Sequence, residues 1–232
     1  MKRINQRSFD SDREETDFGN AGAEKPVINI DLSEGYLGSP RFGWVRQQVH
    51  DLGSRCILCY NLLDIGVDNA ALAVTIAKKS CNPNDPSSPR IRVDGVEADA
   101  QAFKSASEAA RQARERGYIV NVFNTTFEEF HSDKKYDVIV AFEVLEHVKD
   151  PVFCIEKIYD MLEIGGHLFI SIPEQDGIFG TQDKNKYHAW TATAQSIVFR
   201  LFPEDQKWKI IQMFDVGGIL HVMVRKLSHT RW

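Results

Sequence analysis

Acidic and small residues follow two short apolar runs of the chain. The first run leads into Asp64, Gly66 and Asp68, and the second ends at Glu97. A buried parallel strand delivers such residues to a ligand crevice at its carboxyl end, where the next helix offers free backbone N–H groups to a charged ligand. An acid in the position of Glu97 can accept hydrogen bonds from the hydroxyls of a ribose. The alternative for Glu97 is a cap of the following helix, although Asp99 is better placed for that role.

A second polar group, Glu143, Glu146 and His147, follows the apolar run 136–142. A transferase acting on a hydroxyl or an amine benefits from a general base, and histidine is the side chain best matched to neutral pH. We predict His147 and Glu143 as catalytic residues, with His147 as the base and His188 as its competitor. The alternatives are that the group only fixes the turn, or that two acids and a histidine hold a divalent metal. The spacing alone does not show that these side chains converge, so no metal is predicted.

An alternation of strands and helices must position these residues. Apolar runs predict parallel strands, periodic segments predict helices, and the last two runs around Gly217-Gly218 predict a β-hairpin. A double glycine, Gly165-Gly166, is predicted to turn the chain into the fifth strand. The fold class is therefore α/β: a Rossmann-like doubly wound, mostly parallel seven-stranded sheet with a C-terminal antiparallel hairpin. The predicted strands are 57–65, 91–96, 118–123, 136–142, 167–172, 208–216 and 219–226, and the predicted helices are 69–79, 100–116, 151–162 and 192–202.

The domain organisation is simple. Residues 1–26 are polar and charged without apolar periodicity, which predicts a mobile N-terminal tail. We predict a single domain over 27–232, with an entry helix at 41–52 and a surface loop at 81–89. A length of 232 residues with 43% hydrophobic residues suffices for one substantial core.

Composition excludes several classes of protein. The formal net charge is −5 and no long basic run occurs, so no nucleic-acid partner is expected. No 18-residue apolar stretch and no apolar leader occur, so we expect no membrane span and a cytoplasmic location. Cys56 and Cys59 form one Cys-x-x-Cys without a second pair. We expect buried core thiols there, with a redox or metal role as the alternative.

Three segments resemble class I methyltransferases that use S-adenosylmethionine. The segment 136–151 (YDVIVAFEVLEHVKDP) is similar to their fourth strand and the turn after it. The segment 161–173 (MLEIGGHLFISIP) is similar to their double-glycine turn and fifth strand. The segment 61–70 (NLLDIGVDNA) is similar to their first strand and loop. The resemblance covers residues 41 to about 173 and is nearest to the O-methyltransferases of ubiquinone biosynthesis and the small-molecule group around them. It implies S-adenosylmethionine as cofactor, S-adenosylhomocysteine as product, and an oxygen or nitrogen of a small molecule as acceptor.

The resemblance also implies roles for single residues. The family pattern is an acid followed by glycine at every second position, so Asp64 and Gly66 match, whereas Asp68 and Ala70 replace two glycines. Asp68 could face the ammonium group of the cofactor or cap the next helix. The residue at 127 could stack on adenine or serve only as a core anchor. The implied cofactor-binding residues are Arg41 for the carboxylate, Asp64, Gly66 and Asp68 for the loop, Glu97 for the ribose, Thr126 and Phe127 for the adenine, and Phe142.

Two competing hypotheses remain. The missing glycines motivate a non-catalytic binding or regulatory module with the same fold. Nicotinamide-dependent chemistry fits poorly, because the loop lacks the Gly-x-Gly-x-x-Gly spacing. An acceptor pocket is predicted from the segments 36–44 and 174–190, whereas the identity of the acceptor and the oligomeric state are not predicted. The residues expected to line it are Tyr36, Phe42, Phe179, Tyr187, His188 and Trp190.

Overall fold

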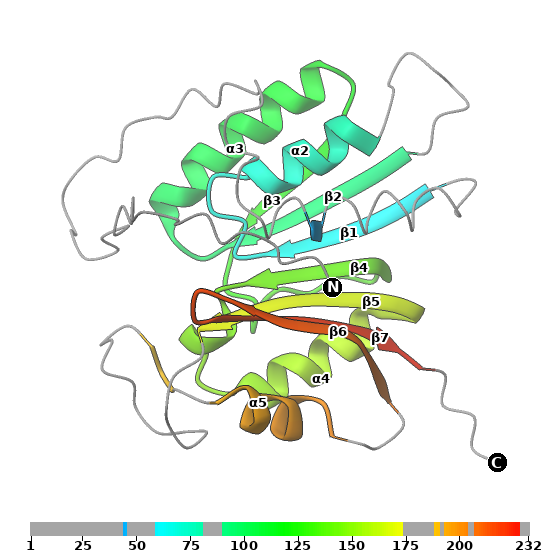
Figure 1. The fold of residues 1–232 in the computed structure, drawn as a ribbon. Coiled ribbons are helices and arrows are strands. Elements are labelled where there is room, and N and C mark those ends of the chain that lie inside the picture. Colours follow the sequence, from blue (N-terminus) through cyan, green and yellow to red (C-terminus); the bar gives the residue numbers. More distant parts are fainter. Residues whose placement is uncertain are drawn as a thin grey trace, which may run out of the picture.

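The structure is a computed structural model, and it describes residues 44–45, 59–80, 90–173, 188–190, 193–203 and 207–227 (Figure 1). Trp44 and Val45 are helical, in agreement with the predicted entry helix. The predicted tail 1–26 and the loop 81–89 lie outside the described residues. So do Arg41, Cys56 and four of the predicted pocket residues, namely Tyr36, Phe42, Phe179 and Tyr187.

Seven strands form one mixed sheet in the order β3-β2-β1-β4-β5-β7-β6. Strands β1 to β5 pair in parallel, whereas β7 is antiparallel to both of its neighbours, β5 and β6. The predicted fold class is thereby confirmed, including the hairpin. The strands are β1 (Cys59–Ile65), β2 (Arg90–Glu97), β3 (Ile119–Asn124), β4 (Tyr136–Phe142), β5 (Leu162–Pro173), β6 (Trp208–Val216) and β7 (Ile219–Lys226).

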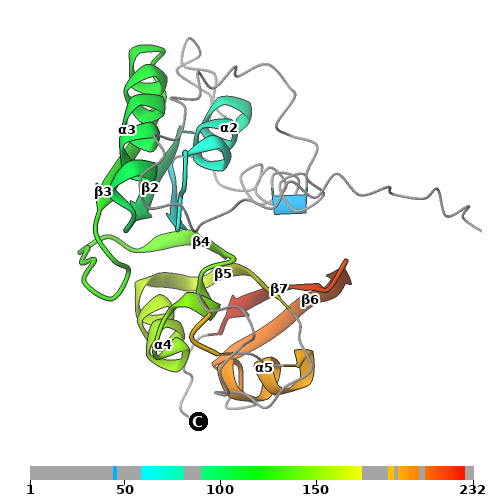
Figure 2. The ribbon, with the colours of Figure 1, turned by 90° about the vertical axis from the view of Figure 1, so that its left-hand side faces the viewer.

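The helices fill the connections between strands. They are α2 (Ala71–Ser80), α3 (Ala100–Glu115), the 3₁₀ turn η2 (Leu145–His147), α4 (Pro151–Met161) and α5 (Ala194–Leu201). Both ribbon views show α2 and α3 together near β2 and β3, and α4 and α5 together near β5 and β6 (Figures 1 and 2). Within the described ranges no helix is long and apolar enough to cross a membrane.

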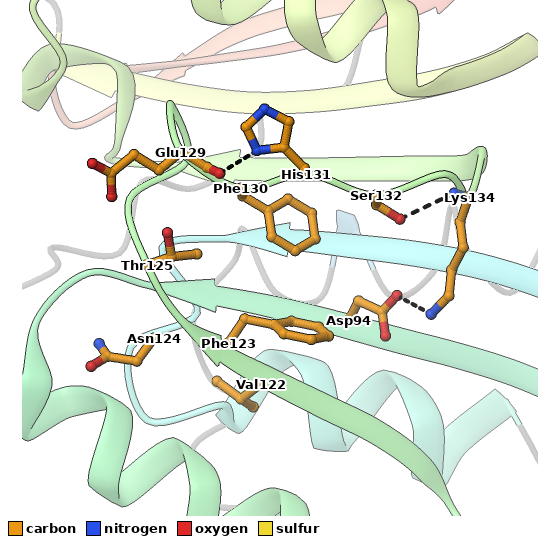
Figure 3. Close-up of a pocket in the computed structure, with 10 residues that line it drawn as sticks. All are labelled: Asp94, Val122, Phe123, Asn124, Thr125, Glu129, Phe130, His131, Ser132 and Lys134. Carbon is orange, nitrogen blue, oxygen red and sulfur yellow. Dashed lines mark hydrogen bonds and ion pairs between the residues drawn. The ribbon is translucent and has the colours of Figure 1, made fainter.

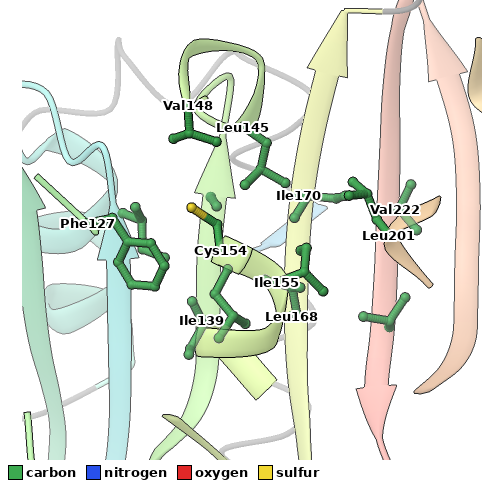
Figure 4. Close-up of a cluster of buried hydrophobic side chains, with 14 of the residues drawn as sticks. Phe127, Ile139, Leu145, Val148, Cys154, Ile155, Leu168, Ile170, Leu201 and Val222 are labelled. Carbon is green, nitrogen blue, oxygen red and sulfur yellow. The ribbon is translucent and has the colours of Figure 1, made fainter. Parts of the chain in front are cut away.

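Both faces of the sheet are covered by a hydrophobic core. Along β1, Leu62 packs in the cluster with α2 and α3, and its neighbour Leu63 packs in the cluster with α4 and α5. Val138 and Ile139 of β4 alternate in the same way, because successive side chains of a strand point to opposite faces. Figure 4 shows the cluster on the α4 and α5 face, with Ile139 beside Ile155 of α4 and with Val222 of β7 on the far side of β5. Burial on both faces is typical of a parallel central sheet and holds the strand ends in place.

The glycine pair before the fifth strand differs from the prediction. Gly165 and Gly166 lie inside β5, and the register with β4 shifts between Tyr136 and Val138. Gly165 has φ +83°, and a Cβ on Gly166 would lie 3.0 Å from the carbonyl oxygen of Asp137. The predicted turn is therefore an irregular excursion within a longer strand: β5 advances from Leu162 to His167 while β4 advances only from Tyr136 to Val138.

Candidate cofactor and catalytic site

Three strand ends meet at one edge of the sheet. In β1, Ile65 lies opposite Val96 of β2 on one side and Ala141 of β4 on the other. Because all three strands run in parallel, Asp64 and Glu97 reach the same edge, as the sequence predicts.

The loop after β1 keeps a tight path although it has lost two glycines. The N–H groups of Gly66 and Val67 both donate to the carbonyl oxygen of Val96, at 2.9 and 3.0 Å. Gly66, Asp68 and Ala70 have φ of +71°, +48° and +62°, so every second residue is left-handed. A left-handed conformation costs an L-residue about 1–2 kcal/mol, and glycine is free of this cost. The backbone thus retains the alternation that the missing glycines would favour.

Gly66 could not be replaced without movement. A Cβ at this position would lie 2.5 Å from Cγ2 of Val144, which follows β4. The loop after β1 and the turn after β4 are therefore in close contact. This contact sets how far apart the cofactor loop and the predicted catalytic residues can lie.

Glu97 organises the loop with both oxygens of its carboxylate. Oε2 accepts a hydrogen bond from the N–H of Asp68 at 2.8 Å, and Oε1 accepts one from the N–H of Asp99 at 2.9 Å. The residue is 9% exposed, and burial, the largest effect, raises its pKa against these two hydrogen bonds. Helix capping falls to Asp99, which accepts from the N–H groups of residues 101 and 102, so the capping alternative for Glu97 is excluded.

The sequence suggested Asp68 as a possible cap of α2, but Asn69 caps this helix. Asn69 Oδ1 accepts a hydrogen bond from the N–H of Ala71 at 3.0 Å, at the start of the helix. The side chain of Asp68 is therefore not needed as a cap, and the residue stays exposed at the edge of the sheet.

Among the residues at this edge, Asp64 gives the clearest indication of a ligand-binding site. It is 4% exposed, and no described residue donates a hydrogen bond to its carboxyl group. Burial, followed by the nearby charges of Glu97 and Asp68, raises the pKa of Asp64 to about 8. A buried carboxyl group with two acids beside it lacks a positive charge. The site therefore fits a cationic ligand, and S-adenosylmethionine carries both a sulfonium and an ammonium group.

In the segment after β3, one predicted adenine-binding residue is exposed and the other is buried in the core. Thr126 is exposed, and its Oγ1 accepts a hydrogen bond from the N–H of Glu129 at 3.3 Å. The ring of Phe127 is 5% exposed and belongs to the core cluster (Figure 4), with Nζ of Lys157 5.2 Å from its centre. The structure thus favours the core-anchor alternative for Phe127 and leaves Thr126 at the surface.

A pocket of about 540 Å³ lies beside the outer strand β3 (Figure 3). Asp94 forms an ion pair with Lys134 at 2.7 Å on its wall, and Phe123 and Phe130 pack against each other there. None of the predicted site residues lines this pocket, although Asn124 on its wall donates a hydrogen bond to the carbonyl oxygen of Glu97 at 2.9 Å. Its lining residues are Asp94, Val122, Phe123, Asn124, Thr125, Glu129, Phe130, His131, Ser132 and Lys134.

The turn after β4 is strained and hydrogen-bonded. Glu143 has φ +53°, its N–H donates to the carbonyl oxygen of Ser171, and its Oε1 accepts from Oγ of Ser171 at 2.6 Å. Phe142 beside it is partly buried against the α2 and α3 face. Among the described residues, the non-glycine residues with positive φ are Asp68, Ala70 and Glu143. All three belong to this edge, and such strain concentrates at functional sites.

The sequence grouped Glu146 and His147 with Glu143, whereas in the structure these two residues lie with His188. Glu146 is 2% exposed and His147 is exposed, and the rings of His147 and His188 lie 5.1 Å apart. One ligand atom from each of these three residues lies within 4.8 Å of the others. Glu143 is not a member of this group, and His188 takes its place. Of the predicted pocket residues, Trp190 is 3% exposed and packs in the core.

Comparison with known proteins gives partial matches to methyltransferases. A model of the methyltransferase domain family matches residues 63–168, which include the end of β1, all of β2, β3 and β4, and most of the edge. The ubiquinone biosynthesis O-methyltransferase of Marinobacter nauticus is 41% identical over 135 residues, covering 56% of this chain and 49% of that protein. The same enzyme of Actinobacillus pleuropneumoniae is 27% identical over 141 residues, covering 58% and 53%. The chain spans about half the length of these relatives.

Solved structures share the fold. The N-methyltransferase NodS from Bradyrhizobium japonicum, in complex with S-adenosylhomocysteine, has a TM-score of 0.57 at 19% identity and covers 87% of this chain and 95% of that one. The [4+2]-cyclase SpnF has a TM-score of 0.62 at 15% identity and covers 80% and 81%. Because a cyclase shares this fold, the activity must be inferred from the site of this chain.

Proposed function

We propose that this chain, which carries a class I S-adenosylmethionine-dependent methyltransferase domain distantly related to the ubiquinone biosynthesis O-methyltransferases, binds S-adenosylmethionine and methylates an oxygen or nitrogen of a small molecule. The observation that carries the proposal is the buried carboxyl group of Asp64 at the strand edge. Its high pKa in the absence of a cation is what a site for a positively charged ligand requires.

Each residue of the edge has a defined task in this proposal. Asp64 provides negative charge for the cationic part of the cofactor, and Glu97 accepts hydrogen bonds from the ribose hydroxyls. Glu97 can do so while bound to two backbone N–H groups, since a carboxylate has about four acceptor sites. The left-handed residues of the loop let the cofactor approach the backbone closely. The cofactor supplies an activated methyl group, so the protein has mainly to align the acceptor and remove its proton.

Removal of the acceptor's proton is assigned to the turn after β4. His147 is exposed and lies next to the strand end, and the imidazole ring is a side chain that can serve as a general base. Glu143 is held by Ser171 in the same turn, and the close contact between Gly66 and Val144 keeps this turn next to the cofactor loop. The hydroxyl or amine of the acceptor would therefore lie between the cofactor methyl and this turn.

Isothermal titration with S-adenosylmethionine and with S-adenosylhomocysteine tests the proposal. We expect binding of both by the wild-type chain, and an affinity for S-adenosylmethionine at least about tenfold lower in Asp64→Asn, since a charge-assisted contact is lost. The exposed Asp133 provides the matched control, and Asp133→Asn should bind as the wild type does. A folded wild-type chain that binds neither compound would refute the proposal and support the non-catalytic module.

A further inference from the structure

We propose that the pocket beside β3 is a binding site for a small aromatic anion, a planar ring that carries a carboxylate or a phosphate group. The ring would lie against Phe123, and the negative group would bind the ammonium group of Lys134. A volume of about 540 Å³ suits a small molecule. Binding here does not depend on the proposed function, because neither Asp64 nor the turn after β4 lines the pocket.

The pocket exists because one connection of the sheet lacks a helix. Four connections join successive parallel strands, and three of them contain α2, α3 and α4. The fourth, the described residues 125–135 between β3 and β4, contains no α-helix. A parallel sheet normally buries both faces under helices, so this gap leaves an apolar side chain uncovered. Phe123 is 40% exposed, whereas the neighbouring Phe130 is 5% exposed.

Phe123 and Phe130 give the pocket an aromatic wall. Their ring centres are 5.4 Å apart and their planes are tilted by 49°, and Phe130 belongs to the core cluster on the α4 face. The buried ring therefore supports the exposed one. A planar ring that stacks on Phe123 would gain from the aromatic contact and from the removal of apolar surface from water. The wall thus favours a flat, aromatic ligand.

Lys134 provides a positive charge that is already oriented. Its Nζ lies 2.7 Å from Oδ2 of Asp94, a residue of β2 that is 2% exposed. An ammonium group has three N–H donors, so two remain for a ligand, and the side chain of Lys134 is half exposed. Figure 3 shows the ring of Phe123 extending towards this ion pair. One ligand can therefore contact the ring and the ammonium group together.

The acids of the pocket do not cancel this attraction. Asp94 is buried, and its carboxylate also accepts hydrogen bonds from Nδ2 of Asn121 at 2.9 Å and from the hydroxyl of Tyr136 at 3.0 Å. An anion that binds the exposed side of Lys134 is nearer to the ammonium group than to the buried carboxylate, so attraction exceeds repulsion. The other acid, Glu129, lies at the opposite side of the pocket from Lys134 (Figure 3).

The pocket adjoins the cofactor edge through the end of β3. Nδ2 of Asn124 donates to the carbonyl oxygen of Glu97 at 2.9 Å, and the N–H of Thr125 donates to the same oxygen at 3.1 Å. Asn124 and Thr125 line the pocket, whereas the carboxylate of Glu97 accepts from the N–H of Asp68 in the loop after β1. The test must therefore distinguish the pocket from the cofactor site.

NMR titration of the nitrogen-labelled full-length chain measures binding with four probes. Benzoate or phenyl phosphate should shift the amide signals of Thr125 and Ser132 in a saturable way, and the tighter of the two identifies the negative group. Benzamide should bind at least about tenfold more weakly than this anion, because it has no charge for Lys134. Cyclohexanecarboxylate should bind about three- to tenfold more weakly than benzoate, because it cannot stack.

Substitutions place the binding in the pocket. Lys134→Gln should weaken binding of the tighter anion at least about tenfold, since a charge-assisted contact is lost. Phe123→Leu should weaken it about three- to tenfold, and this variant should fold because its side chain is substantially exposed. The matched control is Lys104→Gln, which removes an exposed lysine of α3 and should leave binding unchanged.

Four results would overturn the proposal. They are no saturable shift in the folded wild type with either aromatic anion, equal affinity for benzamide, unchanged binding in both Lys134→Gln and Phe123→Leu, and displacement of the anion by S-adenosylhomocysteine. Displacement would show that the anion occupies the cofactor site. A chain that binds the aromatic anion in the pocket but no S-adenosylhomocysteine would refute the proposed function and leave the pocket site standing.

Discussion

Asp64 makes the stability of this protein depend on pH in a way that a single substitution reveals. Its carboxyl group has a pKa of about 8 in the folded chain, against an ordinary value of 3.8. The raised value means that the folded state holds the proton more tightly than the unfolded state. The contribution of Asp64 is therefore most favourable below about pH 4 and is lost as the pH rises towards 8.

The expected magnitude follows from the width of this window. Each pH unit inside it changes the free energy of unfolding by about 1.4 kcal/mol for one such group. From pH 5 to pH 7 the wild type should therefore lose about 3 kcal/mol through Asp64 alone. Asp64→Asn has nearly the same shape and does not titrate, so it lacks this loss.

Urea denaturation of the wild type and of Asp64→Asn at pH 5, 6 and 7 measures the effect. The variant should gain stability relative to the wild type steadily across this range, towards about 3 kcal/mol at pH 7. Asp133→Asn, at an exposed position, should follow the wild type. A difference between wild type and Asp64→Asn that does not change with pH would show that the carboxyl group is not held in its protonated form.

Three further substitutions test the edge around Asp64. Glu97→Ala should weaken S-adenosylmethionine binding by about 1–3 kcal/mol in a titration, because a buried charged acceptor is lost; unchanged affinity would remove Glu97 from the site. Asp68→Gly should bind the cofactor equally or more tightly, because glycine keeps the backbone donor to Glu97 and adopts the positive φ of this position without cost; a sharp loss would show a direct contact of Asp68. Gly66→Ala should lower the free energy of unfolding by about 2 kcal/mol or more, because of its φ of +71° and the contact with Val144; wild-type stability in denaturant would contradict the loop geometry.

Two controls serve these substitutions. Urea denaturation of Glu97→Ala is needed beside its titration, because Glu97 also binds the backbone of the loop. For Gly66→Ala the matched control is Gly217→Ala, since Gly217 has φ +65° but a Cβ there would have no neighbour within 4 Å. The excess loss in Gly66→Ala then measures the contact with Val144.

The sheet was predictable because its strands are apolar runs with clear ends. The runs 136–142, 208–216 and 219–226 have the same bounds in the structure as in the prediction. Gly165-Gly166 was interpreted as a turn, since two glycines in sequence favour one. Their place in an irregular part of β5 depends on the pairing of β5 with β4, which the local sequence does not contain.

The candidate site was predictable where topology alone decides position. Asp64 and Glu97 end neighbouring parallel strands, so their meeting follows from the strand order. The left-handed geometry of Ala70 was not predictable, since alanine has no preference for it. The approach of His188 to His147 depends on the path of the chain between β5 and α5. The one available signal was the presence of two histidines competing for the same role.

The central claim is that the edge around Asp64 binds a cation. Titration with S-adenosylmethionine at pH 6.5, in two buffers that differ in ionisation enthalpy, measures the protons released on binding. At this pH, Asp64 is protonated in the free protein and must lose its proton to face the cofactor. We expect close to one proton released per cofactor bound in the wild type and none in Asp64→Asn. Binding without proton release, or equal release in both chains, would contradict the claim.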